Sequence, residues 1–155
     1  MAQHVRQVPL PPEMRALSTL PQIDYSDVFL AETDRAQDFT AEEWLRKILE
    51  SAPAKFKVAA PTTWFSLGLK HGLPWSDRTI LGWPVLQRDP NFIRVGAESR
   101  TGMPAELLLK RNADSIILAT LIQHRSPVMK RVWSAVAPHH RRVVPQLLWR
   151  GVRVP

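Results

Sequence analysis

The pattern of apolar and polar positions predicts one strand early in the chain and a run of strands in its second half. Residues 24–33 combine β-forming and apolar side chains and predict the first strand. Four further strands, separated by short turns, are predicted at residues 80–86, 91–99, 103–111 and 115–125. Because short links join neighbouring strands that run in opposite directions, we expect these four strands to form an antiparallel meander.

Between these two groups of strands, apolar residues recur at the spacing of an α-helix. Thr40 followed by Glu43 is typical of a capping box, in which each side chain bonds a free backbone N–H at the start of a helix. The apolar positions behind it predict a helix over residues 40–52. The segment 54–73 is also helical in character, and Pro61 predicts a break that divides it into two pieces.

The last helix is predicted over residues 126–149. Ser126 is a favoured N-cap, and Pro127 suits the first helical position because an N–H there would have no helical partner. Pro138 and Pro145 lie inside the helix, and each removes one backbone hydrogen bond, so we expect the helix to be bent. Its main apolar stripe is predicted to consist of Val128, Val132, Val136, Val143 and Leu147, widened by Met129, Trp133, Val144 and Leu148.

The first 23 residues differ from the rest in their proline content. They predict an extended arm, with one or two helical turns that start at the Pro11–Pro12 pair. The apolar residues of this arm indicate that it packs along the body. Residues 24–155 contain no internal repeat and no linker, so they predict a single domain, and the order of its elements is that of an α+β fold.

The composition is that of a globular protein without cysteine. The 155 residues are enough for one domain that buries most of its apolar surface. The lack of cysteine excludes disulfides and thiolate chemistry. No apolar run reaches the roughly 20 residues that span a bilayer, and the N-terminus lacks the apolar core of a secretory signal. We therefore expect a soluble, cytoplasmic protein.

The net charge of +7 raises the question of an acidic partner. A nucleic-acid-binding surface usually gathers its basic residues on one face, often beside aromatic side chains that stack on bases. Here lysines and arginines are scattered, and only the C-terminal third is locally rich in them. We interpret these residues as a solvated helix face and expect no nucleic-acid partner. Binding to acidic lipid or nucleic acid is the alternative.

Motifs of the common catalytic and cofactor sites are absent from the sequence. No serine stands in a Gly-x-Ser-x-Gly turn, and the six glycines are too widely spread for a phosphate-binding or dinucleotide-binding loop. His139 and His140 are adjacent, so on a helix their side chains diverge by about 100° and do not suit zinc. We assign no catalytic residue, no metal and no cofactor.

The predicted bend of the last helix suggests a pocket, because a bent helix cannot lie flush on a twisted sheet along its whole length. The gap is either left open as an apolar pocket or filled by large side chains such as Trp64, Trp83 and Trp133. Polar groups on neighbouring elements would orient a ligand at its mouth. The candidate ligand-binding residues are Trp64, Trp83, Arg94, Glu106, His124, Trp133 and His140.

Four segments and one signature together carry a resemblance to a known family. The segments are residues 24–29, 81–86, 95–98 and 133–145. The signature Ala-x-x-Pro-x-His-Arg falls on Ala135, Pro138, His140 and Arg141. The chain resembles in these parts a bacterial family catalogued as a domain of unknown function. Its members occur alone and behind NmrA-like short-chain dehydrogenase domains, and no catalytic residues are established for it.

The order of the predicted elements is also similar to that of the START-like (SRPBCC) helix-grip superfamily. In that fold a curved sheet wraps around the last helix and commonly encloses an apolar cavity. The resemblance implies a helix-grip-like α+β domain: a curved antiparallel sheet packed on a long kinked C-terminal helix, with two further helices after the first strand.

These expectations fit two main kinds of function. The first is binding of an apolar or amphipathic small molecule in a cavity between the sheet and the C-terminal helix, without a reaction. The second is a cyclase- or hydrolase-type enzyme, which needs an acid–base pair in the same cavity, with Glu106, His124 and Arg94 as candidates. A basic-surface accessory module that contacts acidic lipid or nucleic acid is a weaker alternative. We favour the binding module, as a monomer or a homodimer.

Overall fold

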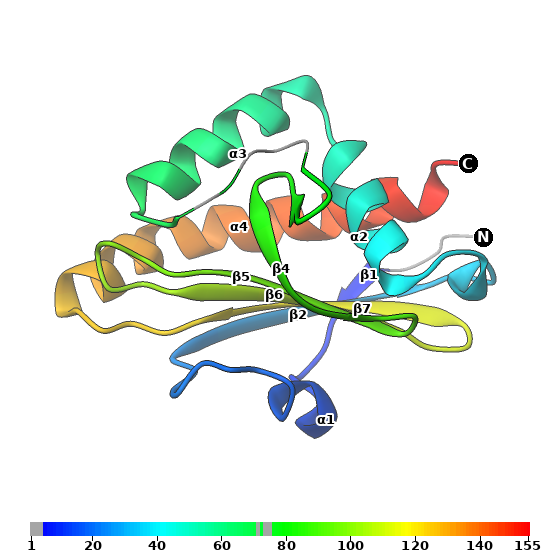
Figure 1. Cartoon of the computed structure of the whole chain (residues 1–155), viewed down its shortest axis with the longest axis horizontal. Helices are drawn as coiled ribbons and strands as arrows, with labels where there is room; N and C mark the ends of the chain where they lie inside the picture. Colours follow the sequence, from blue (N-terminus) through cyan, green and yellow to red (C-terminus); the bar gives the residue numbers. More distant parts are fainter. Residues whose placement is uncertain (1–4, 71, 73–75) are drawn as a thin grey trace.

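The computed structural model describes residues 5–70, 72 and 76–155 and has an α+β fold built on a curved antiparallel sheet (Figure 1). Within these residues seven strands form one sheet in the order β1-β2-β7-β6-β5-β4-β3. The strands are β1 (Val5–Gln7), β2 (Tyr25–Glu32), β3 (Thr79–Ile80), β4 (Trp83–Asp89), β5 (Phe92–Ala97), β6 (Ala105–Arg111) and β7 (Ser115–Ile122). The predicted fold class, with a long C-terminal helix packed on the sheet, is confirmed.

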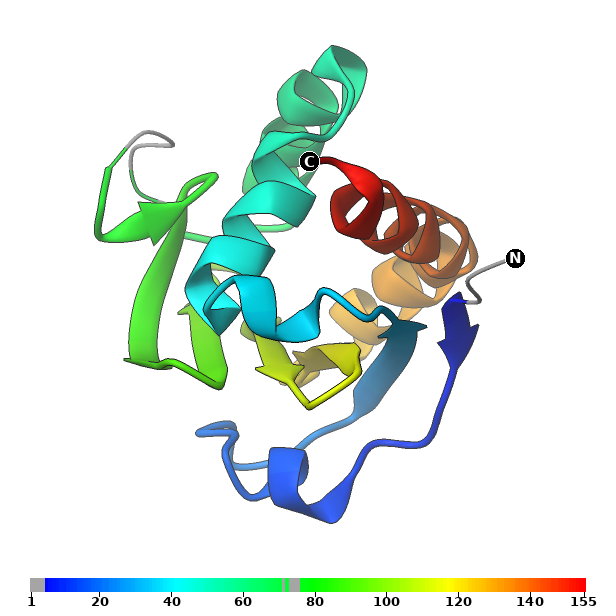
Figure 2. The same ribbon diagram turned by 90° about the vertical axis from the view of Figure 1, so that its right-hand side faces the viewer.

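The helices divide unequally between the two faces of the sheet. The helices α2 (Ala41–Glu50), α3 (Ala54–Ser66) and α4 (Pro127–Arg153) lie over one face, which we call the inner face (Figures 1 and 2). The short α1 (Pro12–Arg15) lies under the opposite, outer face. A 3₁₀ turn over Ala36–Asp38 leads toward α2. In the described part of the chain, no helix is both long and apolar enough to cross a membrane.

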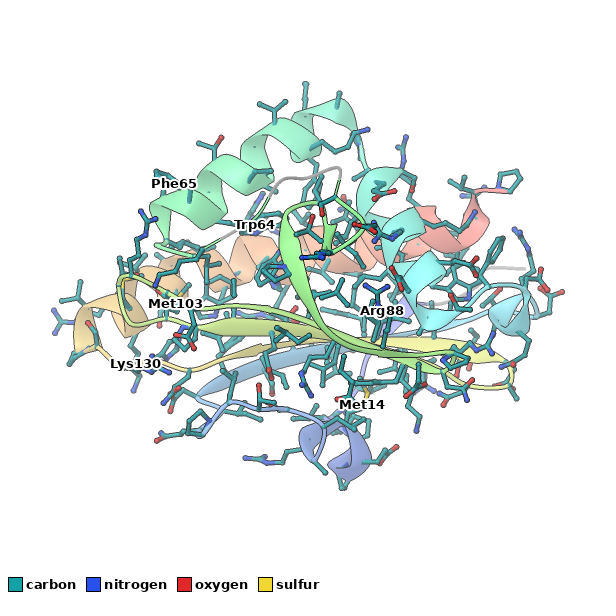
Figure 3. All side chains as sticks on the ribbon, in the orientation of Figure 1. Met14, Trp64, Phe65, Arg88, Met103 and Lys130 are labelled. Atoms are coloured by element: carbon teal, nitrogen blue, oxygen red, sulfur yellow. The ribbon has the colours of Figure 1, made fainter. Side chains whose placement is uncertain are left out.

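Strand β7 is buried along its whole length, between β2 and β6. Ile116, Leu118 and Ile122 belong to the inner core under α2 and α4. Ile117 and Leu121, which alternate with them, pack in the outer core together with Met14 of α1. Figure 3 shows Met14 on the opposite side of the sheet from Trp64 of α3. The apolar residues of this strand therefore belong to two separate layers.

The predicted capping box is present at the start of α2. Thr40 Oγ1 accepts a hydrogen bond from the Glu43 backbone N–H, and the Glu43 carboxylate accepts one of 2.7 Å from the Thr40 N–H. Trp44, one turn into the helix, is fully buried and donates its indole N–H to the Ala36 carbonyl at 2.9 Å. These bonds fix where α2 begins and how it lies on the inner face.

Helix α4 begins as predicted, with the Ser126 hydroxyl accepting from the Met129 N–H, but it extends to Arg153 and continues through Pro138 and Pro145. Its predicted main stripe needs correction, because Val128 and Val132 are exposed. Leu147 of that stripe is buried, together with the residues predicted to widen it, Met129, Trp133, Val144 and Leu148. Periodicity alone could not separate the exposed residues from the buried ones, since all are apolar.

The predicted strand 80–86 is wrong in its extent, because the chain turns inside it. Ile80 pairs with Trp83, so β3 and β4 form a hairpin with Leu81 and Gly82 as its two-residue loop. Both loop residues have positive φ, 47° and 89°, as type I′ hairpin turns require. Leucine rarely adopts this backbone conformation, which is why the turn is invisible in the sequence.

The predicted break at Pro61 is also absent. Helix α3 runs from Ala54 to Ser66 as one piece, although the proline removes one backbone hydrogen bond. Ala60 is the one residue of α3 that is buried. The helix is therefore little constrained by packing around the proline, and the remaining backbone bonds carry it through. The predicted end at residue 73 lies outside the described residues.

The capping box gives a first test of this fold. Replacing Thr40 with alanine leaves an amide of the first turn of α2 without its acceptor, and we expect the free energy of unfolding to fall by about 1 kcal/mol. Urea denaturation measures the loss, with Thr40→Ser, which keeps the hydroxyl, as the matched control. Equal stability of Thr40→Ala and the unaltered protein would contradict the role of Thr40 as the N-cap.

The contact between α2 and α4 gives a second test. A Cβ added at Gly151 of α4 would lie 2.5 Å from Cγ1 and 2.8 Å from Cα of Ile48 in α2. At a solvent-exposed position inside a helix, replacing glycine with alanine stabilises the protein by up to about 1 kcal/mol. Here we expect Gly151→Ala to destabilise by about 1 to 3 kcal/mol, because the helices must separate. Urea denaturation decides the sign, and a gain in stability would show that the two helices are not in close contact.

Candidate functional site

A pocket of about 480 Å³ lies between the inner face of the sheet, α3 and α4. Its floor consists of inward-facing sheet residues, its outer wall comes from α2 and α3, and α4 closes the remaining side. Almost all of these side chains are apolar. They include Ala105, Leu107, Leu118 and Ile122 from the sheet, Leu45, Ile48, Phe56 and Ala60 from α2 and α3, and Val136, Val143 and Leu147 from α4.

Three tryptophans line this pocket, one from α3, one from β4 and one from α4. The rings of Trp64 and Trp83 meet edge to face with their centroids 5.3 Å apart, and Trp64 also contacts Phe56. Figure 3 shows Trp64 beneath α3, between that helix and the sheet. The pocket volume of about 480 Å³ is the space left with all three rings present. The tryptophans therefore form the walls of the pocket and do not fill it.

A buried polar cluster joins β2 to α4 beside the pocket. The Asp27 side chain is 0% exposed, and its Oδ2 accepts a hydrogen bond of 2.6 Å from the Tyr25 hydroxyl. His140 Nδ1 lies 2.7 Å from the same oxygen. Because a carboxylate can only accept, this bond requires the proton on Nδ1. The imidazole is thereby held in one orientation and one tautomer.

Further polar atoms of the site have no partner among the described residues. Asp27 Oδ1, Thr120 Oγ1 and Trp133 Nε1 are all buried and unbonded. Thr120 stands directly opposite Asp27 on β7, and the Trp133 and His140 rings meet edge to face with centroids 5.2 Å apart. Thr120, Trp133 and His140 all line the pocket. A mostly apolar pocket therefore contains buried polar groups without a partner beside His140.

Tyr25 completes this part of the site. Burial, and then the hydrogen bond to Asp27 and its charge, raise the pKa of the Tyr25 hydroxyl well above 10.0, while Arg141 at 3.4 Å opposes the shift. The hydroxyl consequently stays protonated at neutral pH and donates a hydrogen bond to Asp27. Tyr25 also packs edge to face on Trp133, so one side chain supports both the carboxylate and the indole.

Four of the seven candidate residues, Trp64, Trp83, Trp133 and His140, lie in the pocket wall. Glu106 and Arg94 do not, which corrects their expected place at the mouth. Glu106 is buried on the outer face, where it accepts hydrogen bonds from the Ser18 hydroxyl at 2.6 Å and from the Thr19 backbone, with Arg94 Nε at 3.6 Å. Glu106 alternates with the inward-facing Ala105 and Leu107, so β6 directs it away from the pocket.

His124 also lies outside the pocket lining. It follows the end of β7, and its backbone N–H donates to Asp24 at 2.7 Å. Burial lowers the pKa of its imidazole, so the neutral ring is favoured there. Glu106, His124 and Arg94 therefore cannot act together in one cavity.

Sequence reasoning missed Asp27, Tyr25 and Thr120. A signal was present, because Tyr25, Asp27 and Phe29 occupy alternate positions of a strand and share one face. A carboxylate between two aromatic residues on that face indicates a buried charge, which needs a partner. What the pattern does not contain is the partner, since His140 lies 113 residues further along the chain.

No group of three His, Asp or Glu side chains with the arrangement of a metal site occurs in residues 5–70, 72 and 76–155. No family model matches the chain, and neither does any curated protein. Among solved structures, a protein of unknown function from Pseudomonas aeruginosa is similar to it at 13% identity, over 100% of this chain and 85% of that one, with a TM-score of 0.28. A TM-score this low carries no argument. The family resemblances of the sequence stay expectations.

The cluster gives a direct test, because Tyr25 is the only tyrosine of the chain. We expect tyrosinate absorbance to appear at higher pH in the folded protein than in the unfolded chain, where tyrosine titrates near 10.0. Since the neutral hydroxyl is favoured by folding, this contribution to stability is complete below that pH and is lost as the pH rises through the raised folded-state pKa. Asp27→Asn should lower the folded-state pKa. Coincident folded and unfolded titrations would contradict the cluster.

Proposed function

We propose that this protein binds an apolar or amphipathic small molecule in the pocket between the inner face of the sheet, α3 and α4. The observation that carries the proposal is the pocket itself. Its volume of about 480 Å³ falls in the range of small-molecule sites, about 300–1,000 Å³. Apolar walls with a few convergent polar groups are the usual composition of such sites.

The chemistry of the walls supports a ligand with two unlike parts. Aliphatic and aromatic side chains of α2, α3 and the sheet suit an apolar body, whose transfer from water is favourable by about 25 cal/mol for each Å² buried. Thr120, Trp133 and His140 offer hydrogen-bonding atoms in the wall formed by β7 and α4. The similarity of the predicted element order to helix-grip domains supports the same class of function.

Helix α3 supplies a wall through which a ligand can enter. Ala60 is the one buried residue of this helix, and Val58 and Phe65 are strongly exposed. Figure 1 shows α3 standing above α4 and the sheet, attached through its two ends. Displacing a helix with so few buried side chains costs little free energy, because little apolar surface is exposed to water when it moves.

Adjacent residues of α3 allow a matched test of this proposal. Both residues are exposed, but Ala59 lines the pocket, whereas Val58, at 72% exposure, is not part of the lining. We expect anilinonaphthalene sulfonate (ANS) to bind the protein saturably with enhanced fluorescence. Ala59→Trp should weaken binding about tenfold, equivalent to about 1.4 kcal/mol, because the new ring occupies the pocket. Val58→Trp should bind like the unaltered protein.

Two outcomes contradict the proposal: no saturable ANS binding by the folded protein, or equal affinities of the two tryptophan variants. Native mass spectrometry of the purified protein adds an independent measurement. A co-purified small molecule that is retained by Val58→Trp and lost from Ala59→Trp would identify the ligand directly.

A further inference from the structure

We propose that His140 is a general base that removes a proton from the carbon next to a carbonyl group of a ligand bound in the pocket. The inference rests on the proposed binding function and goes beyond it, because it makes the pocket an active site for enolisation. The substrate class is an apolar carbonyl compound. Its body lies against the aliphatic and aromatic walls, and its carbonyl group lies beside His140.

The position of the imidazole supports a base. Asp27 accepts from Nδ1 at 2.7 Å, which leaves the lone pair of His140 on Nε2. Within the described residues no group occupies Nε2, and His140 is part of the pocket wall. A carboxylate that holds a histidine in this way also stabilises the imidazolium formed when the base takes up a proton. Tyr25 fixes the carboxylate from its other side, at 2.6 Å.

Two side chains with hydrogen-bond donors line the pocket together with His140. Trp133 and Thr120 are 5% and 4% exposed, line the pocket beside His140, and have no partners for their Nε1–H and hydroxyl groups among the described residues. A carbonyl oxygen carries no proton and accepts from both. When the neighbouring carbon loses its proton, negative charge develops on that oxygen, and preorganised donors of this kind stabilise it.

A purely structural Asp–His pair would leave this arrangement unexplained. Buried polar groups are normally satisfied, because each unpaired one costs free energy. Here Oδ1 of Asp27 and the donors of Thr120 and Trp133 are all unpaired. Thr120 and Trp133 line the pocket, and Thr120 stands opposite Asp27 in the sheet. The fold holds polar groups at the place where a ligand would pair with them, and functional sites are where such exceptions are found.

The reaction balances without a co-reactant. The C–H bond breaks, its proton goes to His140 Nε2, and its electron pair forms a carbon–carbon double bond. The carbonyl π pair moves onto the oxygen, which accepts from Trp133 and Thr120. The proton on Nε2 then returns to the same carbon or to a conjugated one, or exchanges with solvent. The class of reaction is therefore enolisation or double-bond isomerisation. His140 is the catalytic residue, and Asp27 and Tyr25 are positioning residues.

Deuterium exchange provides the test. The apolar ketone β-tetralone is incubated with the full-length protein in D₂O, and loss of the proton signal at the benzylic carbon next to its carbonyl is followed by NMR. We expect the protein to accelerate exchange over buffer. His140→Gln should lower the protein-catalysed rate about 100-fold, the lower end of what a positioned acid–base group contributes. His124→Gln is the matched control, because His124 lies outside the pocket lining, and it should keep the full rate.

Two further variants separate catalysis from structure. Thr120→Val replaces a buried hydroxyl by a methyl group of similar shape, and it should lower the exchange rate about 100-fold while β-tetralone still displaces ANS. Asp27→Asn should also lower the rate, and long-range ¹H–¹⁵N spectra should show His140 no longer fixed in the Nδ1–H tautomer. If His140→Gln fails to fold, Thr120→Val and Asp27→Asn carry the test.

The outcomes distinguish this inference from the proposed function. In the first case ANS binds and β-tetralone displaces it, but exchange is no faster than in buffer or is equally fast in His140→Gln. The pocket then binds ligands, and the general-base role of His140 is wrong. If ANS does not bind saturably and exchange is not accelerated, both proposals are wrong. Exchange that falls in His124→Gln as much as in His140→Gln would also overturn the inference, since the effect would then not come from the pocket.

Discussion

The burial of the central strand β7 on both faces is the constraint from which the rest of the architecture follows. A strand directs alternate side chains to opposite sides, so an apolar run such as Ser115–Ile122 needs a cover on each. The N-terminal segment with α1 covers the outer face, held there by hydrogen bonds from Ser18 and Thr19 to Glu106. Helices α2 and α4 cover the inner face. Hydrogen bonds to the Glu106 carboxylate thus hold the N-terminal segment on the outer face, and close packing holds α2 and α4 on the inner face.

The pocket is a consequence of how the inner cover is assembled. Gly151 allows the C-terminal end of α4 to pack directly on Ile48 of α2, so the two helices seal one end of the inner face. Toward the other end of α4 the cover passes to α3, which buries little of its own surface. Side chains from three helices and the sheet surround the space between them without filling it. Tight packing at one end and a loosely held helix at the other give a rigid site with a displaceable wall.

Strand register decides which polar groups belong to this site. Asp27 and Glu106 are both buried acids in strands, yet a difference in parity sends one inward and the other outward. On the inner face Asp27 meets Thr120 across the strand pair and His140 from the helix above. On the outer face Glu106 meets Arg94 and the N-terminal segment. The same kind of residue is therefore part of a candidate active site in one place and a structural anchor in the other.

The sequence alone determined the features that depend on neighbouring residues: the α+β class, the capping box at Thr40 and Glu43, and the start of α4 at Ser126. It failed where a neighbour far along the chain overrides local preference, as at Leu81, which adopts positive φ inside a buried hairpin, and at Pro61, which lies in an unbroken helix. It identified His140 and the three tryptophans of the pocket, but not Asp27 or Thr120. Tertiary structure alone decided the site, because a hydrogen bond between residues 113 positions apart depends on how a helix lies across a sheet, and no local pattern encodes that distance.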